Sequence, residues 1–174
     1  EGQSVEVVGN HKDEYILAFD PSWSESESSD DFAMLLIKLN KDTRKGTVVH
    51  SYALSGASLK THIKYMAYVL THFNVVAVVG DYNGGVQFIN SCNESTIFKD
   101  KNLKLGVIEA ELDKAKDYDK NLRRLKNQYN LSQKNIVFLR KPTSAWIRFA
   151  NESLQSAFDH KKIFFAGAAM NDDY

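Results

Sequence analysis

Residues 15–39, YILAFDPSWSESESSDDFAMLLIKL, contain the pattern that decides the fold. An apolar segment typical of a buried strand ends at Asp20, and a polar loop rich in Ser and Glu follows it. The apolar residues 32–39 predict a second strand, because a short polar connection between two such segments favours an antiparallel pair. The aspartate that ends the first strand either forms the following turn, as Asp-Pro sequences commonly do, or faces a ligand.

Further strands and helices follow this pair. Residues 47–54 predict a third strand, which completes an antiparallel meander. The segment VVAVVG at 75–80 is apolar throughout and predicts a central parallel strand buried on both faces. Other strands are expected at 104–110, 135–141 and 161–167, and helices at 59–73, 84–92, 113–130 and 143–158. The sequence therefore predicts an α/β fold with a central mixed sheet, three antiparallel strands and then parallel strands, flanked by helices.

The composition is that of a globular domain. The chain has 174 residues, of which 43% are hydrophobic and 25% charged, enough for one domain with a substantial core. Its apolar runs are too short to span a bilayer, so no membrane partner is expected. The single Cys92 cannot form an internal disulfide, which suits a reducing compartment. Because the sequence begins at Glu1 without a Met, we expect residues 1–174 to be one domain of a longer protein.

Charge is unevenly distributed along the chain. Residues 99–148 hold 13 Lys and Arg against 6 Asp and Glu, whereas residues 1–98 hold 7 against 12. This division suits polyanion binding near a cation site, although a solvated Lys-rich helical surface would give the same pattern. The candidate phosphate-contacting residues are Arg123, Arg124, Lys126, Arg140 and Lys141.

A second aspartate, Asp81, ends the apolar segment 75–80 and precedes Tyr-Asn-Gly-Gly. If the strands at 15–20 and 75–80 are neighbours, Asp20 and Asp81 lie side by side at one edge of the sheet. Two close carboxylates repel each other, and a divalent cation removes that conflict. Oxygen ligands suit Mg²⁺ or Mn²⁺, and two such ions can activate a water for phosphodiester cleavage. Further candidate ligands are Asp31, Asp159, Asp172 and Asp173, of which the last two could instead cap a helix.

The order of these motifs resembles the nuclease domain of phage terminase large subunits, the DNA-packaging motors of tailed phages. The matching segments are Asp20-Pro21-Ser22, Asp31, residues 81–85 in an acid-x-Asn-x-Gly pattern, and Asp172-Asp173. The resemblance implies an RNase H-like fold and two Mg²⁺ or Mn²⁺ ions. It also implies that Asp20 bridges both ions, that Asp81 holds one, and that Asp173 or Asp172 completes the other. Ser22, Asp31, Asn83 and Gly84 would surround this site. The family more often has Glu at the position of Asp81.

The resemblance also implies a function. It predicts a metal-dependent endonuclease that cuts concatemeric double-stranded DNA with little sequence specificity, in the host cytoplasm during virus assembly. The implied partners are double-stranded DNA, the portal protein and the small terminase subunit. The sequence contains no G-x-x-x-x-G-K-[ST] motif, so the ATPase domain of such a motor is expected upstream of Glu1. The alternatives are another RNase H-like nuclease, of the resolvase or transposase type, and a non-catalytic docking module of a packaging motor.

Overall fold

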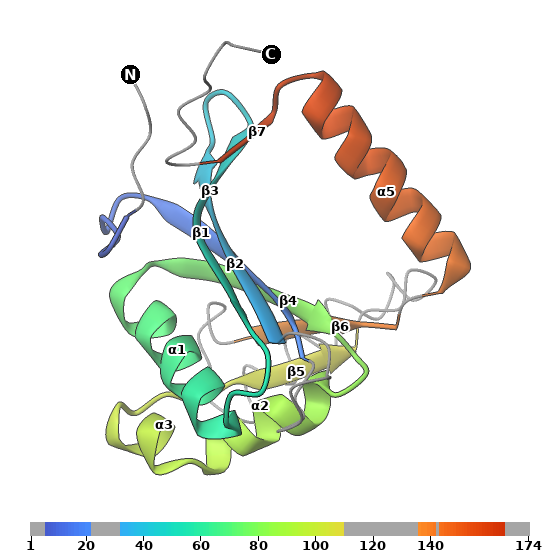
Figure 1. Ribbon diagram of the computed structural model, residues 1–174. Coiled ribbons are helices and arrows are strands. Elements are labelled where there is room, and N and C mark those ends of the chain that lie inside the picture. The colour runs from blue at the N-terminus through green and yellow to red at the C-terminus, as the bar shows by residue number, and fades with distance from the viewer. Residues whose placement is uncertain (1–5, 22–31, 110–135, 142, 166–174) are drawn as a thin grey trace.

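A computed structural model describes residues 6–21, 32–109, 136–141 and 143–165. Within these residues, seven strands form one sheet in the order β5-β6-β4-β1-β2-β3-β7 (Figure 1). The strands are β1 (Glu14–Asp20), β2 (Phe32–Asn40), β3 (Lys45–Leu54), β4 (Val75–Asp81), β5 (Gly106–Glu109), β6 (Ile136–Arg140) and β7 (Ile163–Phe165). The helices are α1 (Leu59–His72), α2 (Gly85–Glu94), α3 (Thr96–Asp100) and α5 (Ser144–Asp159). The predicted α/β class is confirmed.

The sheet is mixed, as the sequence predicts. Strands β1, β2 and β3 form an antiparallel meander. Strand β4 pairs with β1 in parallel, β6 pairs with β4 in parallel, and β5 pairs with β6 in parallel. The short β7 pairs in parallel with the beginning of β3. The helix predicted over residues 113–130 lies outside the described residues, whereas the short helix α3 was not predicted.

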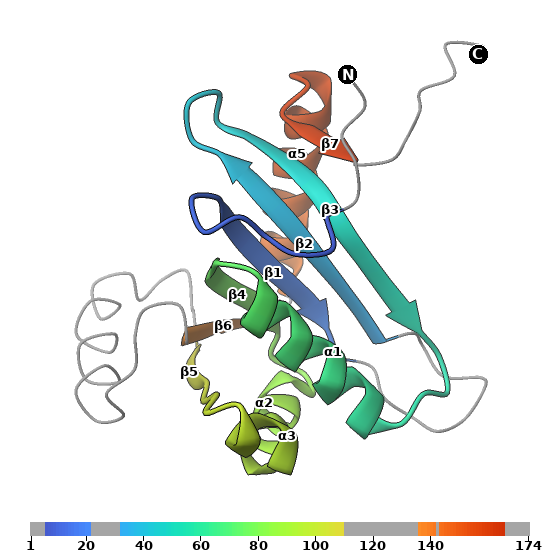
Figure 2. The same cartoon turned by 90° about the vertical axis from the view of Figure 1, so that its left-hand side faces the viewer.

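One face of the sheet carries the hydrophobic core. Alternate side chains of β1 point to the same face, and Tyr15, Leu17 and Phe19 are all buried there. They belong to one cluster with buried residues of α1 and α2, including Met66 and Phe88. Figure 2 views the sheet from the side of α1, with α5 behind the sheet. The first three helices therefore cover one face, and α5 lies on the other side.

The opposite face is only partly covered by the described residues. Leu35 pairs with Ala18, and Ala18 pairs with Val79, so these residues form an apolar row across three strands. Leu35 and Val79 are nevertheless 38% and 37% exposed. The prediction that residues 75–80 are buried on both faces is therefore wrong for Val79. Helix α5 itself keeps apolar side chains about half exposed, namely Ile147, Phe149, Leu154 and Phe158.

The contact between Phe19 and Gly80 brings β1 close to β4. These two residues are partners in the parallel pairing. A Cβ atom on Gly80 would lie 2.5 Å from two atoms of the Phe19 ring, which is shorter than any normal contact. The Phe19 ring also packs against Phe88 of α2, with 5.6 Å between the ring centroids. Residue 80 must therefore be glycine for the ring to lie across β4.

We predict that Gly80→Ala destabilises the fold by about 1–3 kcal/mol, the usual cost of overpacking a core. The added methyl group would have to displace the buried ring of Phe19 or separate the two strands. Urea unfolding followed by circular dichroism measures the change in the free energy of unfolding.

The matched test combines this variant with Phe19→Leu, which removes the ring that the methyl group meets. The double variant should lose less stability than the sum of the two single losses, because the residues are in contact. Strict additivity would contradict the proposed contact.

Candidate functional site

Asp20 and Asp81 come together at one edge of the sheet, as the sequence predicts. They directly follow Phe19 and Gly80, which are paired in the parallel register of β1 and β4. The ring of Phe19 lies over Gly80 on the α2 side, so the alternation of side chains places both aspartates on the opposite face. Asp20 is exposed and Asp81 is half-buried. The two strands therefore present adjacent carboxylates at the same edge.

A tight turn after β4 holds the Asp81 carboxylate. The backbone N–H of Asn83 donates a hydrogen bond of 2.8 Å to Asp81 Oδ1. Gly84 follows with a φ of 76°, a left-handed conformation that favours glycine, and α2 begins at the next residue. A Cβ atom on Gly85 would lie 2.9 Å from Leu139 of β6. The Asn-Gly-Gly sequence therefore fixes the carboxylate and packs the start of α2 against the sheet. A carboxylate has about four lone-pair positions, so this hydrogen bond is compatible with metal binding.

Two of the predicted phosphate-contacting residues lie at this edge. Arg140 is paired with Asp81 in the register of β4 and β6. The Tyr82 N–H donates a 2.8 Å hydrogen bond to the Arg140 carbonyl oxygen, which ties the end of β4 to β6. The next side chain, Lys141, places its Nζ 4.4 Å from the centroid of the Tyr82 ring. The edge therefore combines carboxylates with cationic side chains.

Tyr82 is the residue of this edge that the sequence reasoning missed. It occupies the unspecified position of the acid-x-Asn-x-Gly pattern, and its neighbour Lys141 is 59 positions later in the chain. Only the pairing of β4 with β6 brings the two together. The one sequence feature that could have marked Tyr82 as a site residue is its position directly after Asp81, the acid that ends β4.

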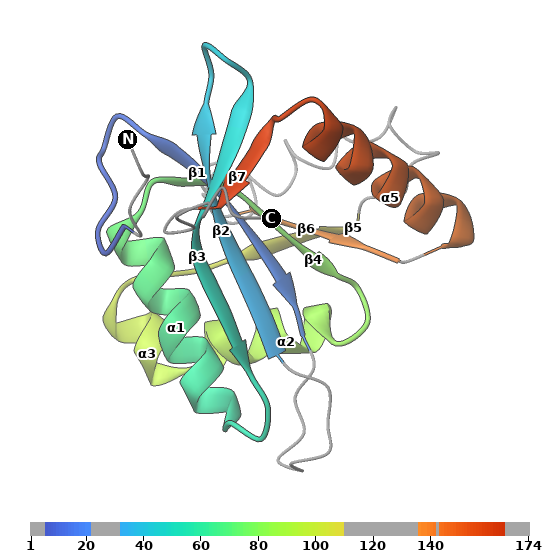
Figure 3. The same cartoon turned by 45° about the horizontal axis from the view of Figure 1, so that its top comes forward.

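The other predicted site residues lie outside the described residues. They are Ser22, Asp31, Arg123, Arg124, Lys126, Asp172 and Asp173. The remaining candidate, Asp159, ends α5 close to β7, at the far end of the sheet from the C-terminal end of β4 (Figure 3). Among the described residues, no group of three or more His, Cys, Asp or Glu could hold a metal ion. The described part of the site is therefore a pair of carboxylates.

The sequence matches no protein-family model and no curated protein. Among the described helices, none is both long enough and apolar enough to cross a membrane.

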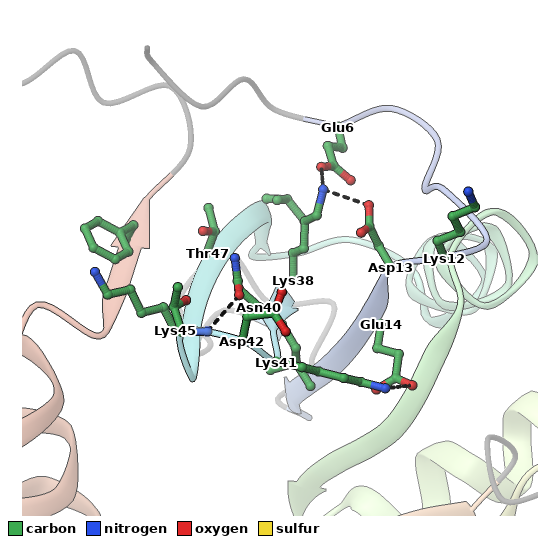
Figure 4. A pocket seen from close by; sticks show the side chains of 14 residues that line it. Glu6, Lys12, Asp13, Glu14, Lys38, Asn40, Lys41, Asp42, Lys45 and Thr47 are labelled. Carbon is green, nitrogen blue, oxygen red and sulfur yellow. Dashed lines mark hydrogen bonds and ion pairs between the residues drawn. The ribbon is translucent and has the colours of Figure 1, made fainter.

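A polar cavity of about 880 Å³ lies at the other end of the sheet, beside the β2–β3 hairpin (Figure 4). Its central cation, Lys38, donates to Glu6 Oε1 at 2.7 Å and to Asp13 Oδ2 at 2.8 Å. Lys41 pairs with Glu14 at 2.6 Å. These ion pairs join the N-terminal segment to β2 and to the hairpin. We therefore assign this region a structural role and place the candidate site at the opposite edge.

The Tyr15 hydroxyl also joins this network by donating a hydrogen bond to the Glu6 carboxylate. Burial raises the pKa of Tyr15 from 10.0 to about 12, and the hydrogen bond to Glu6 acts in the same direction. Hydrogen bonds to Asp13 and then to Glu6 raise the pKa of Lys38. In both groups the folded state therefore favours the protonated form.

We predict that Tyr15 and Lys38 contribute a constant amount to the free energy of unfolding below about pH 10, and that this contribution is lost progressively above pH 10. A pKa that folding raises contributes stability below the unfolded value, and this contribution is lost as the pH rises through the folded value. Urea unfolding at a series of pH values measures the profile. Tyr15→Phe removes one titrating group, so its profile should fall less steeply, and an unchanged slope would contradict the assignment to Tyr15.

Proposed function

We propose that this chain is an RNase H-like nuclease domain of the phage terminase type, which cuts double-stranded DNA with divalent metal ions. The observation that carries the proposal is the adjacency of Asp20 and Asp81 at the ends of two parallel central strands. The sheet, in which an antiparallel meander is followed by parallel strands, is compatible with that fold. The motif order from Asp20 to Asp173 supports the same family.

The carboxylates fit a hard divalent cation. Both are acidic oxygen ligands on neighbouring strands, and Mg²⁺ and Mn²⁺ prefer such ligands. In the proposal Asp20 would be shared by two ions, Asp81 would hold one of them, and Asp173 or Asp172 would complete the other. Bound ions of this kind lower the pKa of a water and stabilise the leaving oxygen in phosphodiester hydrolysis.

The protein itself would orient the ligands and the substrate. The hydrogen bond from the Asn83 N–H fixes Asp81 Oδ1, while the paired strands β1 and β4 fix the position of Asp20. Arg140 at the same edge would contact a DNA phosphate, and Arg123, Arg124 and Lys126 would extend the contact. Phosphate contacts carry no base information, so sequence specificity should be low. The surrounding residues Ser22, Asp31 and Gly84 would shape the loops around the cleavage site.

In this proposal the domain works within a DNA-packaging motor in the host cytoplasm. Double-stranded DNA is its substrate, and the portal protein and the small terminase subunit are its partners. An ATPase domain would precede it in the full-length protein.

A second candidate function is a docking module that keeps the fold without catalysis. The partly exposed apolar face favours it, because Leu35, Val79 and the exposed side of α5 leave apolar surface uncovered by the described residues. Metal dependence distinguishes the two functions.

We predict that Asp20→Asn abolishes Mn²⁺-dependent cleavage of supercoiled plasmid DNA, because a neutral amide cannot replace the bridging carboxylate. Agarose gel electrophoresis measures the cleavage, and circular dichroism checks the fold. Asp42→Asn, at an exposed position in the β2–β3 hairpin at the other end of the sheet, is the matched control and should cleave at the wild-type rate. Full activity of Asp20→Asn would refute the mechanism.

We also predict that Mn²⁺ raises the melting temperature of the wild-type protein, because a ligand that binds only the folded state stabilises it. Asp81→Asn should reduce this increase, and Asp42→Asn should retain it. Differential scanning calorimetry with and without millimolar Mn²⁺ measures the effect. An absence of metal-dependent stabilisation in the wild type would favour the docking module.

A further inference from the structure

The edge that carries the carboxylates has two sides with different chemistry. Asp81 and Arg140 are partners in the pairing of β4 and β6, so their side chains share one face of the sheet. Tyr82 and Lys141 each follow by one residue, beyond the ends of the two strands. Tyr82 packs against the hydrophobic core, which lies on the α2 face of the sheet, and the Lys141 ammonium group lies over the Tyr82 ring. Lys141 and Arg140 are therefore neighbours in sequence that point to opposite sides of the edge.

Tyr82 gives Lys141 a fixed position. The Tyr82 side chain is half-buried and packs against the hydrophobic core. Its backbone N–H is held by the Arg140 carbonyl oxygen at 2.8 Å. Lys141 is exposed, and its Nζ lies 4.4 Å from the centroid of the ring. A cation over an aromatic ring is attracted by the electrons of the ring, so the N–H groups that point away from the ring can still donate.

This arrangement matches the chemistry of a DNA backbone. A lysine ammonium binds a phosphate as a point charge, and a ring that restricts its position reduces the entropy lost on binding. The lysine faces the α2 side of the edge, whereas the carboxylates face the other side. A phosphate at Lys141 would therefore be a different one from the phosphate that is cleaved.

We propose that Tyr82 and Lys141 form a phosphate clamp on the α2 side of the edge, in which Tyr82 is the positioning residue and Lys141 the contact. The clamp adds one phosphate contact to the affinity for duplex DNA, and Arg140 serves the side where cleavage occurs. This inference rests on the proposed function, since it takes double-stranded DNA as the ligand.

The test measures binding of a fluorescein-labelled DNA duplex of about 30 base pairs by fluorescence anisotropy, in EDTA and at several KCl concentrations. Each phosphate contact contributes about 0.9 to the slope of log affinity against log salt. For Lys141→Ala, the ratio of wild-type to variant affinity should therefore fall about 3.5-fold between 50 and 200 mM KCl. Tyr82→Leu should show a change of the same sign, and Tyr82→Phe, which keeps the ring, should bind as the wild type does.

Steady-state cleavage in Mn²⁺ supplies a second readout. For Lys141→Ala, the loss should appear mainly in KM, whereas for Arg140→Ala it should appear mainly in kcat. Because Tyr82 packs against the core, urea unfolding checks the fold of Tyr82→Leu. If that variant does not fold, the comparison of Tyr82→Phe with Lys141→Ala still decides the question.

Wild-type affinity and salt slope in Lys141→Ala would overturn the clamp, as would a weakened Tyr82→Phe. A loss confined to kcat in Lys141→Ala would also overturn it. These results would leave the nuclease proposal intact if Asp20→Asn still abolishes cleavage. Conversely, Lys141-dependent duplex binding without any metal-dependent cleavage would support the clamp and refute the nuclease. A wild-type protein that does not bind duplex DNA would refute both.

Discussion

The parallel pairing of β1 with β4 is the constraint on which the rest of the structure depends. It joins the antiparallel meander to the parallel strands, and it places the buried side chains of both strands in one core. The same pairing brings Asp20 and Asp81 to one edge. Without it, each aspartate would only end a strand and form a turn.

The edge that carries the two carboxylates also carries a positive charge, because Arg140 is paired with Asp81 in the register of β4 and β6. The hydrophobic core lies directly behind this edge. Phe19 and Phe88 pack together on the face opposite to the carboxylates, and Phe19 is only 5% exposed. This packing fixes the two strand ends from which the carboxylates project.

Much of the fold could be predicted from the sequence, because strand and helix patterns are local. The meander and the parallel direction of β4 followed from apolar segments and the lengths of their connections. The lateral order of the later strands did not, because β6 lies between β4 and β5 although it follows both in the chain. The apolar residues 75–80 showed that the strand is hydrophobic, but not whether other elements cover both of its faces. Val79 was therefore wrongly expected to be buried. The five-residue helix α3 is too short to show a periodic pattern.

The candidate site was also predictable only in part. Asp20 and Asp81 could be paired from the sequence because both end central strands. The contact of Tyr82 with Lys141 could not, since it depends on which strand lies beside β4. The acids and basic residues outside the described ranges remain predictions.

The glycine at position 80 also selects the alignment of the two strands. In the strand sequence VVAVVGD, it is the only residue without a side chain, and it lies beside the bulky ring of Phe19. A slip of one residue would place Val79 or Asp81 beside that ring and turn the side chains of β4 to the wrong face. The steric fit that admits the ring therefore also rejects misaligned sheets. Gly80 therefore fixes the register of β4 against β1, and in this register Asp20 and Asp81 lie at the same edge of the sheet.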